Sequence, residues 1–136
     1  MKTQIILILT VLGLLAACKK QQQSIAIPEG TYSGRFIYRG KGIIYQYRQV
    51  PVTLTFSGQN YTSSGGANYY PAGGSGIYSA NNRDSITFHD GNAWTANFDW
   101  NLILNGDYAY HYEGDSLVIN KDITSLASYE YRIKKN

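Results

Sequence analysis

Large side chains recur at every second position over most of the chain from Thr31 onward, and this period of two constrains the fold more than any other feature of the sequence. Side chains on a β-strand point to opposite faces in turn, so the pattern is typical of strands with one buried face. The even positions of residues 31–39 and 49–57 are mostly apolar or aromatic, and the odd positions are mostly polar. We therefore predict half-buried strands over both ranges.

The same pattern predicts further strands at residues 84–90, 101–113, 117–119 and 129–133. Residues 57–60, 81–84, 90–92 and 113–115 separate them and hold the Gly, Asn, Asp and Ser that favour turns. Residues 43–47 carry their large side chains at odd positions, which predicts a bulge or turn near Arg48. Pro51 lacks an amide donor and is expected at a sheet edge or bulge. Residues 65–75 are predicted to form a glycine- and serine-rich loop, and residues 92–100 fit both a strand and one helical face.

This count gives about eight strands, and their short connections permit only antiparallel neighbours. A flat sheet of that length would leave exposed edges and an uncovered apolar face, whereas closure into a barrel removes both. The composition agrees, because 13 Tyr and 14 Gly accompany many Thr, Ser and Asn. We predict an all-β fold, an antiparallel meander of about eight strands closed into a barrel.

The N-terminus has a different character. Lys2 precedes an apolar run at residues 5–15, and two lysines follow at positions 19 and 20, so the run is too short for a membrane span of about 20 residues. The segment Leu15, Ala16, Ala17, Cys18 resembles the lipobox of bacterial lipoproteins. That resemblance implies cleavage before Cys18 and attachment of diacylglycerol to its thiol. It predicts a signal peptide at 1–17, a lipidated cysteine with a polar tether at 18–28, and a barrel domain at 29–136.

The alternative is an ordinary cysteine beside an ordinary secretory cleavage site. Cys18 is the single cysteine of the sequence, so no intramolecular disulfide is possible, and lipidation would consume a thiol that is otherwise free and reactive. Two acyl chains suffice for stable anchoring. We expect membrane lipid as a partner and a location in the bacterial cell envelope, at the outer membrane.

The ends of the domain carry a second resemblance. A glycine and an aromatic residue, Gly30 and Tyr32, open the first strand, and Tyr129, Tyr131 and Ile133 close the last. Both segments are similar to those of small bacterial lipocalin-like lipoproteins. The resemblance implies a barrel fold that can contain a cavity, and it does not fix a ligand.

Signals of catalysis are weak. His89 and His111 fall at outward positions without metal-ligand spacing, and the aspartates mostly flank turns. The sequence contains neither a nucleophile elbow nor a phosphate-binding loop. From Ser24 onward nine basic residues balance nine acidic ones, so the sequence lacks the excess of positive charge that is typical of nucleic-acid binding. We expect no enzyme activity, metal, cofactor or nucleic-acid partner.

Tyrosines are the one feature that suggests a ligand. Seven are predicted to face inward: Tyr32, Tyr38, Tyr108, Tyr110, Tyr112, Tyr129 and Tyr131. Buried hydroxyls need hydrogen-bond partners, so they predict either a hydrated, tyrosine-lined cavity or rings packed inside with hydroxyls at the barrel ends. In the first case a small hydrophobic or aromatic ligand binds inside, with Trp94, Phe98 and Trp100 near the mouth. In the second the barrel is a scaffold or inhibitor whose loops contact another envelope protein.

Overall fold

The computed structural model describes residues 27–42, 45–81 and 83–136, and the described residues form eight β-strands and two short 3-10 helices. The strands are β1 (Gly30–Lys41), β2 (Tyr45–Ser57), β3 (Asn60–Ser63), β4 (Gly74–Ala80), β5 (Ser85–Asp90), β6 (Gly106–Glu113), β7 (Ser116–Thr124) and β8 (Ala127–Lys135). The 3-10 helices are η1 (Ala67–Tyr69) and η2 (Trp100–Leu102). Cys18 and the rest of the expected signal peptide lie outside the described residues, as does the tether before Ile27.

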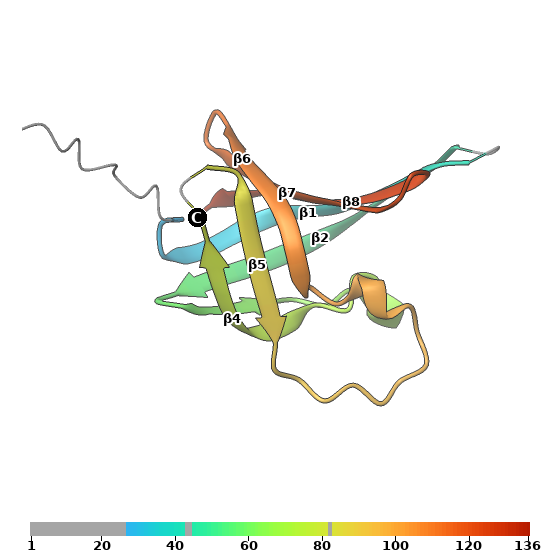
Figure 1. Ribbon diagram of the computed structural model, residues 1–136, viewed down its shortest axis with the longest axis horizontal. Coiled ribbons are helices and arrows are strands. Elements are labelled where there is room, and N and C mark those ends of the chain that lie inside the picture. The colour runs from blue at the N-terminus through green and yellow to red at the C-terminus, as the bar shows by residue number, and fades with distance from the viewer. Residues whose placement is uncertain (1–26, 43–44, 82) are drawn as a thin grey trace, which may run out of the picture.

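Each strand pairs antiparallel with the next in the sequence, and β8 pairs with β1 to close the barrel (Figure 1). This confirms the predicted fold, an antiparallel meander of eight strands closed into a barrel. Closure brings β1 and β8 very close at Gly34. A Cβ atom there would lie 2.1 Å from the carbonyl oxygen of Arg132, so only glycine fits.

The predicted bulge or turn near Arg48 is wrong. β1 and β2 pair in one continuous register, from Gly30 opposite Phe56 to Lys41 opposite Tyr45. Tyr47 lies on the outer face of the barrel and is exposed, so the large odd-numbered residue there needs no change of phase. Pro51 lies at an edge, as expected, because β2 pairs with β3 only at residues 54–57.

The strand pattern missed β3 and β4, which lie in a stretch rich in small residues. β4 begins at Gly74, inside the range predicted as loop. The strand predicted at 101–113 is also wrong in its first part, because η2 occupies Trp100–Leu102 and β6 starts only at Gly106, with φ +85°. Of residues 92–100, which fitted both a strand and one helical face, residues 92–99 form neither, and Trp100 begins η2.

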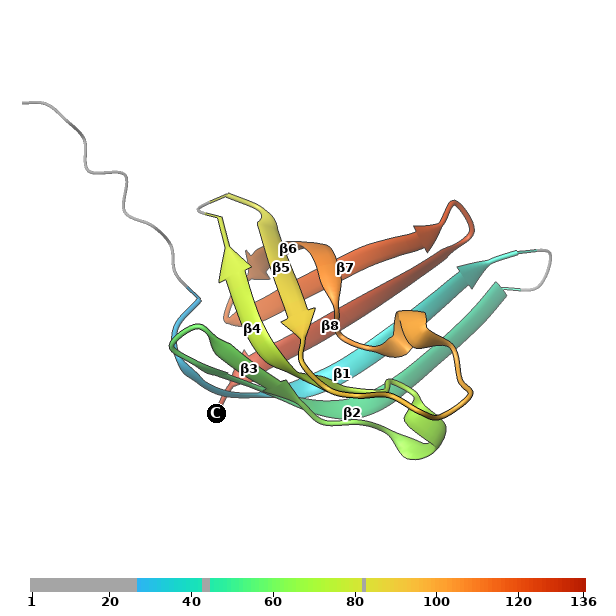
Figure 2. The ribbon, with the colours of Figure 1, turned by 60° about the horizontal axis from the view of Figure 1, so that its bottom comes forward.

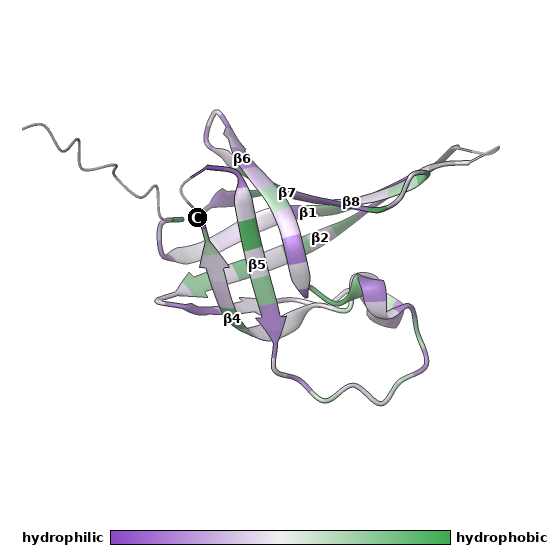
Figure 3. Ribbon diagram, viewed as in Figure 1, coloured by the Kyte–Doolittle hydropathy of each residue, from purple (hydrophilic) through white to green (hydrophobic). Residues whose placement is uncertain are grey.

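The interior is packed with side chains, and half of the largest fully buried ones are aromatic. They are Tyr32, Tyr61, Tyr131, Phe36, Phe56, Phe88, Leu54, Ile86, Leu104, Leu117, Ile119 and Ile133. Edge-to-face contacts link many of the rings; for example, the centroids of Tyr61 and Phe88 are 4.8 Å apart. Figure 3 shows the hydrophobic residues alternating with polar ones along β5. The barrel therefore has a close-packed aromatic core.

The two ends of the barrel differ. Because the strands run up and down in turn, Ile27 enters at the end that holds the short β2–β3, β4–β5 and β6–β7 turns, which we name the entry end. The opposite end, the loop end, carries the β3–β4 loop at residues 64–73 and the β5–β6 loop at residues 91–105. Figure 2 shows both loops beside those halves of β1 and β2 that lie farther from the point where the chain enters the barrel.

No α-helix of membrane-spanning length and hydropathy occurs in the described part of the chain.

Candidate functional site

Several tyrosines predicted to face inward are indeed buried, with hydroxyls bonded at the barrel ends. At the entry end, Tyr32 donates to the carbonyl oxygen of Pro28 over 2.7 Å, and Tyr110 donates to that of Asn81 over 2.7 Å. At the loop end, Tyr129 donates to Oδ2 of Asp99 over 3.2 Å. Tyr61, which the sequence pattern missed, donates to the carbonyl oxygen of Leu104 over 2.6 Å. Segments at the two ends of the barrel thus supply the hydrogen-bond acceptors for these hydroxyls.

The other candidate tyrosines have varied surroundings. Tyr131 is buried in the centre of the core, and Tyr108 is buried beneath the ammonium of Lys121, which lies 5.0 Å from its ring centroid. Tyr38 is half-buried at the loop end. Tyr112 lies on the inner face as predicted, since it pairs with buried Leu117 and meets Tyr32, but it is 39% exposed because it lies near the end of β6. The candidate tyrosines therefore do not line one common space.

Burial alters the acidity of these phenols. It raises the pKa of Tyr32 to about 12 and raises those of Tyr61 and Tyr131 as well. For Tyr129, burial and then the charge of Asp99 raise the pKa. The phenols therefore stay neutral at physiological pH and act here as packed rings with hydrogen-bond donors.

The three predicted mouth residues do come together, joined by a residue that the sequence analysis missed. Tyr69, Trp94, Phe98 and Trp100 form what we name the aromatic loop cluster. Tyr69 stacks on Phe98 with a centroid distance of 4.7 Å and an interplanar angle of 11°. Trp94 meets Phe98 at 5.6 Å, edge to face. Tyr69 is 46% exposed and Trp100 59% exposed, so the cluster presents aromatic surface to solvent at the loop end.

Tyr69 is held in this position against backbone strain. Asn68 and Tyr69 both adopt left-handed backbone conformations, with φ of 54° and 57°. Such a conformation is unusual for a bulky residue and costs about 1–2 kcal/mol. A strained residue at an exposed position is a reasonable indicator of function.

A second group of side chains lies where the β3–β4 loop meets the barrel. The guanidinium of Arg48 lies 5.4 Å from the ring centroid of Tyr70, and Tyr70 in turn contacts Phe36 and Tyr38 edge to face. The Tyr70 hydroxyl is buried and finds no hydrogen-bond partner among the described residues. Burial raises the pKa of Tyr70 to about 12, although Arg48 partly opposes it. A buried donor without a partner is uncommon and marks a site that a ligand or water can complete.

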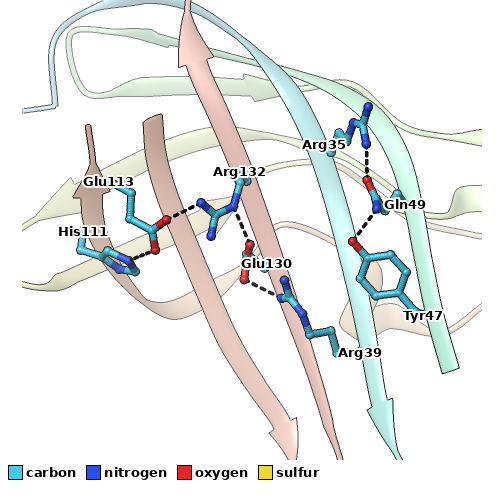
Figure 4. Close-up of polar contacts among 8 residues, drawn as sticks. All are labelled: Arg35, Arg39, Tyr47, Gln49, His111, Glu113, Glu130 and Arg132. Carbon is cyan, nitrogen blue, oxygen red and sulfur yellow. Dashed lines mark hydrogen bonds and ion pairs between the residues drawn. The ribbon is translucent and has the colours of Figure 1, made fainter. Parts of the chain in front are cut away.

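The outer face of β6, β8 and β1 carries a chain of ion pairs, which we name the outer ion network (Figure 4). Arg39 donates to Glu130 over 2.5 Å, and Arg132 donates to Glu130 over 3.0 Å and also to Glu113. His111 contacts Glu113 at 3.1 Å. Ile37 and Val118 are buried on the same outer face, and the register places them beside Glu130 and Arg132 respectively. The network therefore covers apolar surface outside the barrel.

The network acidifies its carboxyl groups. Hydrogen bonds from Arg132 and then His111 lower the pKa of Glu113 to about 2. Burial alone would raise the pKa of Glu130, but hydrogen bonds from Arg39 and Arg132 outweigh it and leave the pKa lowered. These carboxylates are consequently ionised and paired at neutral pH.

A groove of about 580 Å³ lies over the outer face of β1, β2 and β8, with buried Ile37 among its lining residues and Arg35 at its side. Arg35 donates to Oε1 of Gln49 over 2.5 Å, and Gln49 donates to the Tyr47 hydroxyl (Figure 4). Three polar residues of adjacent strands are thus linked without a carboxylate among them.

In the described part of the chain, no cluster of three or more His, Cys, Asp or Glu residues could hold a metal ion. His89 and His111 are both exposed, as their outward parity indicates.

Comparison of the chain with protein-family models, curated proteins and solved structures finds no match.

Proposed function

We propose that this chain is a bacterial cell-envelope lipoprotein, anchored by lipid on Cys18, and that its lipocalin-like barrel is a non-catalytic scaffold for contact with another envelope protein. The observation that carries the proposal is the position of the aromatic loop cluster. It presents exposed Trp100 and Tyr69 at the barrel end opposite the entry of the chain. A lipid anchor before Ile27 would direct this surface away from the membrane that holds the anchor.

The composition of the cluster suits a protein interface. Tryptophan and tyrosine are enriched among the residues that contribute most to binding between proteins, since they bury large areas with little loss of conformational entropy. Asp90 fixes the loop around Trp94 through hydrogen bonds, so the rings are already ordered before a partner arrives. Preordered contacts raise affinity.

Site-specific photo-crosslinking in the native envelope tests this role. A benzoyl-phenylalanine residue at position 100 or 69 should crosslink to an envelope protein, whereas the same residue at exposed positions of the entry end, Gln59 or Asp115, should not. Crosslinking that is equal at the two ends, or confined to the entry end, would refute the proposed interface. Trp100→Ala should lower the yield of a crosslink formed from position 69.

A second candidate is the binding of a small hydrophobic or aromatic ligand by the barrel. The packed core offers it little room, but the unpartnered Tyr70 hydroxyl beside Tyr38 favours a ligand at the loop end. A hydrophobic probe or a lipid extract should then change tryptophan emission saturably. Tyr70→Phe, which removes the hydroxyl and keeps the ring, should alter the affinity; an unchanged affinity would argue against this candidate.

A further inference from the structure

β2 has a partner along its whole length on one side only. On the β1 side its pairing runs from Tyr45 to Phe56. On the other side it pairs with β3 at residues 54–57, and among the described residues no strand pairs with it before that point. Residues 46–52 therefore form an open sheet edge on the β3 side of the strand.

The direction of the free main-chain groups follows from Thr53. The amide of Ser64 donates to the carbonyl oxygen of Thr53 over 2.9 Å, and the amide of Thr53 donates to Oγ of Ser64 over 2.9 Å. Thr53 thus points both of its main-chain groups away from β1. Because this direction alternates along a strand, those of Pro51, Gln49 and Tyr47 point the same way. The edge offers the carbonyl oxygens of all three and the amides of Gln49 and Tyr47.

Each face of this edge has a groove. On the inner face a groove of about 420 Å³ is lined by Arg48, Gln49, Val50, Ala67, Asn68 and Tyr70. On the outer face a groove of about 340 Å³ is lined by Arg35, Tyr47, Gln49, Val50 and Pro51. A strand added to the edge would place its side chains alternately into the two grooves, since successive side chains point to opposite faces.

Both grooves favour negative charge. Each contains one arginine, and none of the described residues that line them is acidic. Arg48 lies over the ring of Tyr70 and Arg35 bonds to the neutral Gln49, so neither contact neutralises a guanidinium. Glu130, opposite Ile37 of β1, is engaged in the outer ion network. Asp99, whose charge acts on Tyr70, accepts hydrogen bonds from Tyr129 and from the amide of Asn101.

We propose that the open edge of β2 binds an extended, acidic peptide segment of a partner protein by β-strand addition. The inference rests on the proposed scaffold role for its biological context and names the chemistry of the partner. Pairing with a second copy of this chain is disfavoured, because two edges brought together antiparallel would place the Arg48 side chains of both copies on one face. Like charges on one face of a strand pair are destabilising.

Capped nine-residue peptides of alternating valine and glutamate are suitable probes, titrated against the full chain in detergent micelles. The glutamate peptide should bind saturably, and its lysine counterpart should bind at least about tenfold more weakly at low salt. Strand pairing uses the amides of every second peptide residue. The peptide thus has two alternating sets of amides. N-methylation of the set that pairs with β2 should abolish binding, whereas N-methylation of the other set should leave it intact.

A matched pair of variants tests the protein side. Gln49→Pro removes the amide that faces the open edge and spares the hydrogen bonds to β1. Gln49→Thr removes the same side chain but keeps the amide. Loss of one backbone hydrogen bond should weaken peptide binding by about tenfold in the first variant relative to the second.

Three results would overturn the inference: no saturable binding of the glutamate peptide, equal effects of N-methylation on the two alternating sets of amides, or equal affinity of the two Gln49 variants for the peptide. Concentration-dependent dimers abolished by Gln49→Pro would instead assign the edge to a second copy. The peptide assay does not involve Trp100, and the crosslinking experiment does not involve Gln49. Failure of one proposal is therefore distinguishable from failure of the other.

Discussion

Asp90 holds the indole of Trp94 by a direct hydrogen bond, in which Nε1–H donates to Oδ2 over 2.5 Å. The other carboxylate oxygen accepts from the main-chain amide of Ser75 over 2.9 Å and from the side-chain amide of Asn92 over 2.9 Å. Asp90 is the last residue of β5, and Ser75 lies in β4. One carboxylate thus connects two strands to the loop that carries most of the aromatic loop cluster.

Asp90→Ala should destabilise the protein by about 1–3 kcal/mol, because several donors lose their acceptor together. Trp94→Phe keeps an aromatic ring and removes one donor, so its effect should be smaller, about 0.5–1.5 kcal/mol. Urea denaturation measures both effects. In Asp90→Ala the tryptophan emission should also move to longer wavelength as the loop loosens. If Asp90→Ala costs no more than Asp122→Ala, an exposed carboxylate in β7, Asp90 does not hold the loop.

Neighbouring residues of β5 provide a test of the packed interior. Phe88 is fully buried among Phe56, Tyr61 and Tyr108, whereas His89 is exposed on the opposite face. Phe88→Ala should cost about 3–5 kcal/mol, and His89→Ala should stay within about 0.5 kcal/mol. Equal shifts of the denaturation midpoint would mean that the interior is loose enough to tolerate the loss of a ring.

Alternation was sufficient to predict the closed meander, because it acts through local geometry: the parity of Tyr32, Phe36 and Leu54 in the sequence matches their burial in the barrel. It failed where side chains carry little information. β3 and β4 are short or rich in glycine and serine, so their pairing depends on neighbours from elsewhere in the chain. The irregularity expected near Arg48 was wrong for a different reason. Tyr47 is large but lies exposed on the outer face, and its size was interpreted as a sign of burial.

The candidate site was less predictable than the fold. Trp94, Phe98 and Trp100 were identified by their size, but their partner Tyr69 lies in a distant loop and reaches them only through tertiary structure. Asp90 was interpreted as a turn residue, and its side chain does bond to the local amide of Asn92. Nothing in its sequence neighbourhood indicated the bond to Ser75. The open edge of β2 depends on where β3 ends, which no local pattern specifies.

The outer ion network should make stability depend on pH in the acid range. The pKa of Glu113 is about 2 in the fold, below its ordinary value of 4.5, because Arg132 and His111 favour the carboxylate. Its contribution to stability is therefore complete above pH 4.5 and is lost as the pH falls towards 2. Glu130, whose pKa is also lowered, should act in the same direction.

Glu113→Gln should weaken that pH dependence, and thermal melts between pH 2 and pH 7 would show it. Arg132→Gln should weaken it too, and the double variant should add little beyond the larger single effect, since both changes remove one interaction. Salt should reduce the difference from the unmodified protein, because the pair is solvent-exposed. A melting temperature that falls equally steeply with acid in Glu113→Gln would exclude this pair as its source.

The lipid anchor gives the last prediction, and it depends on the position of one cysteine. In bacterial cells the chain should incorporate a labelled fatty acid and partition into the detergent phase, and Cys18→Ser should abolish both properties. Cys18→Ser combined with Ser24→Cys is a matched control. It restores a thiol six residues beyond the lipobox, so a lipidation that needs Leu15, Ala16 and Ala17 directly before the cysteine should not recover. Two acyl chains are needed for stable anchoring, so loss of the thiol should leave an unprocessed or a soluble form rather than weaken the attachment gradually. Detergent partitioning that is unchanged in Cys18→Ser, or fully restored in the double variant, would contradict the anchor and with it the orientation proposed for the aromatic loop cluster.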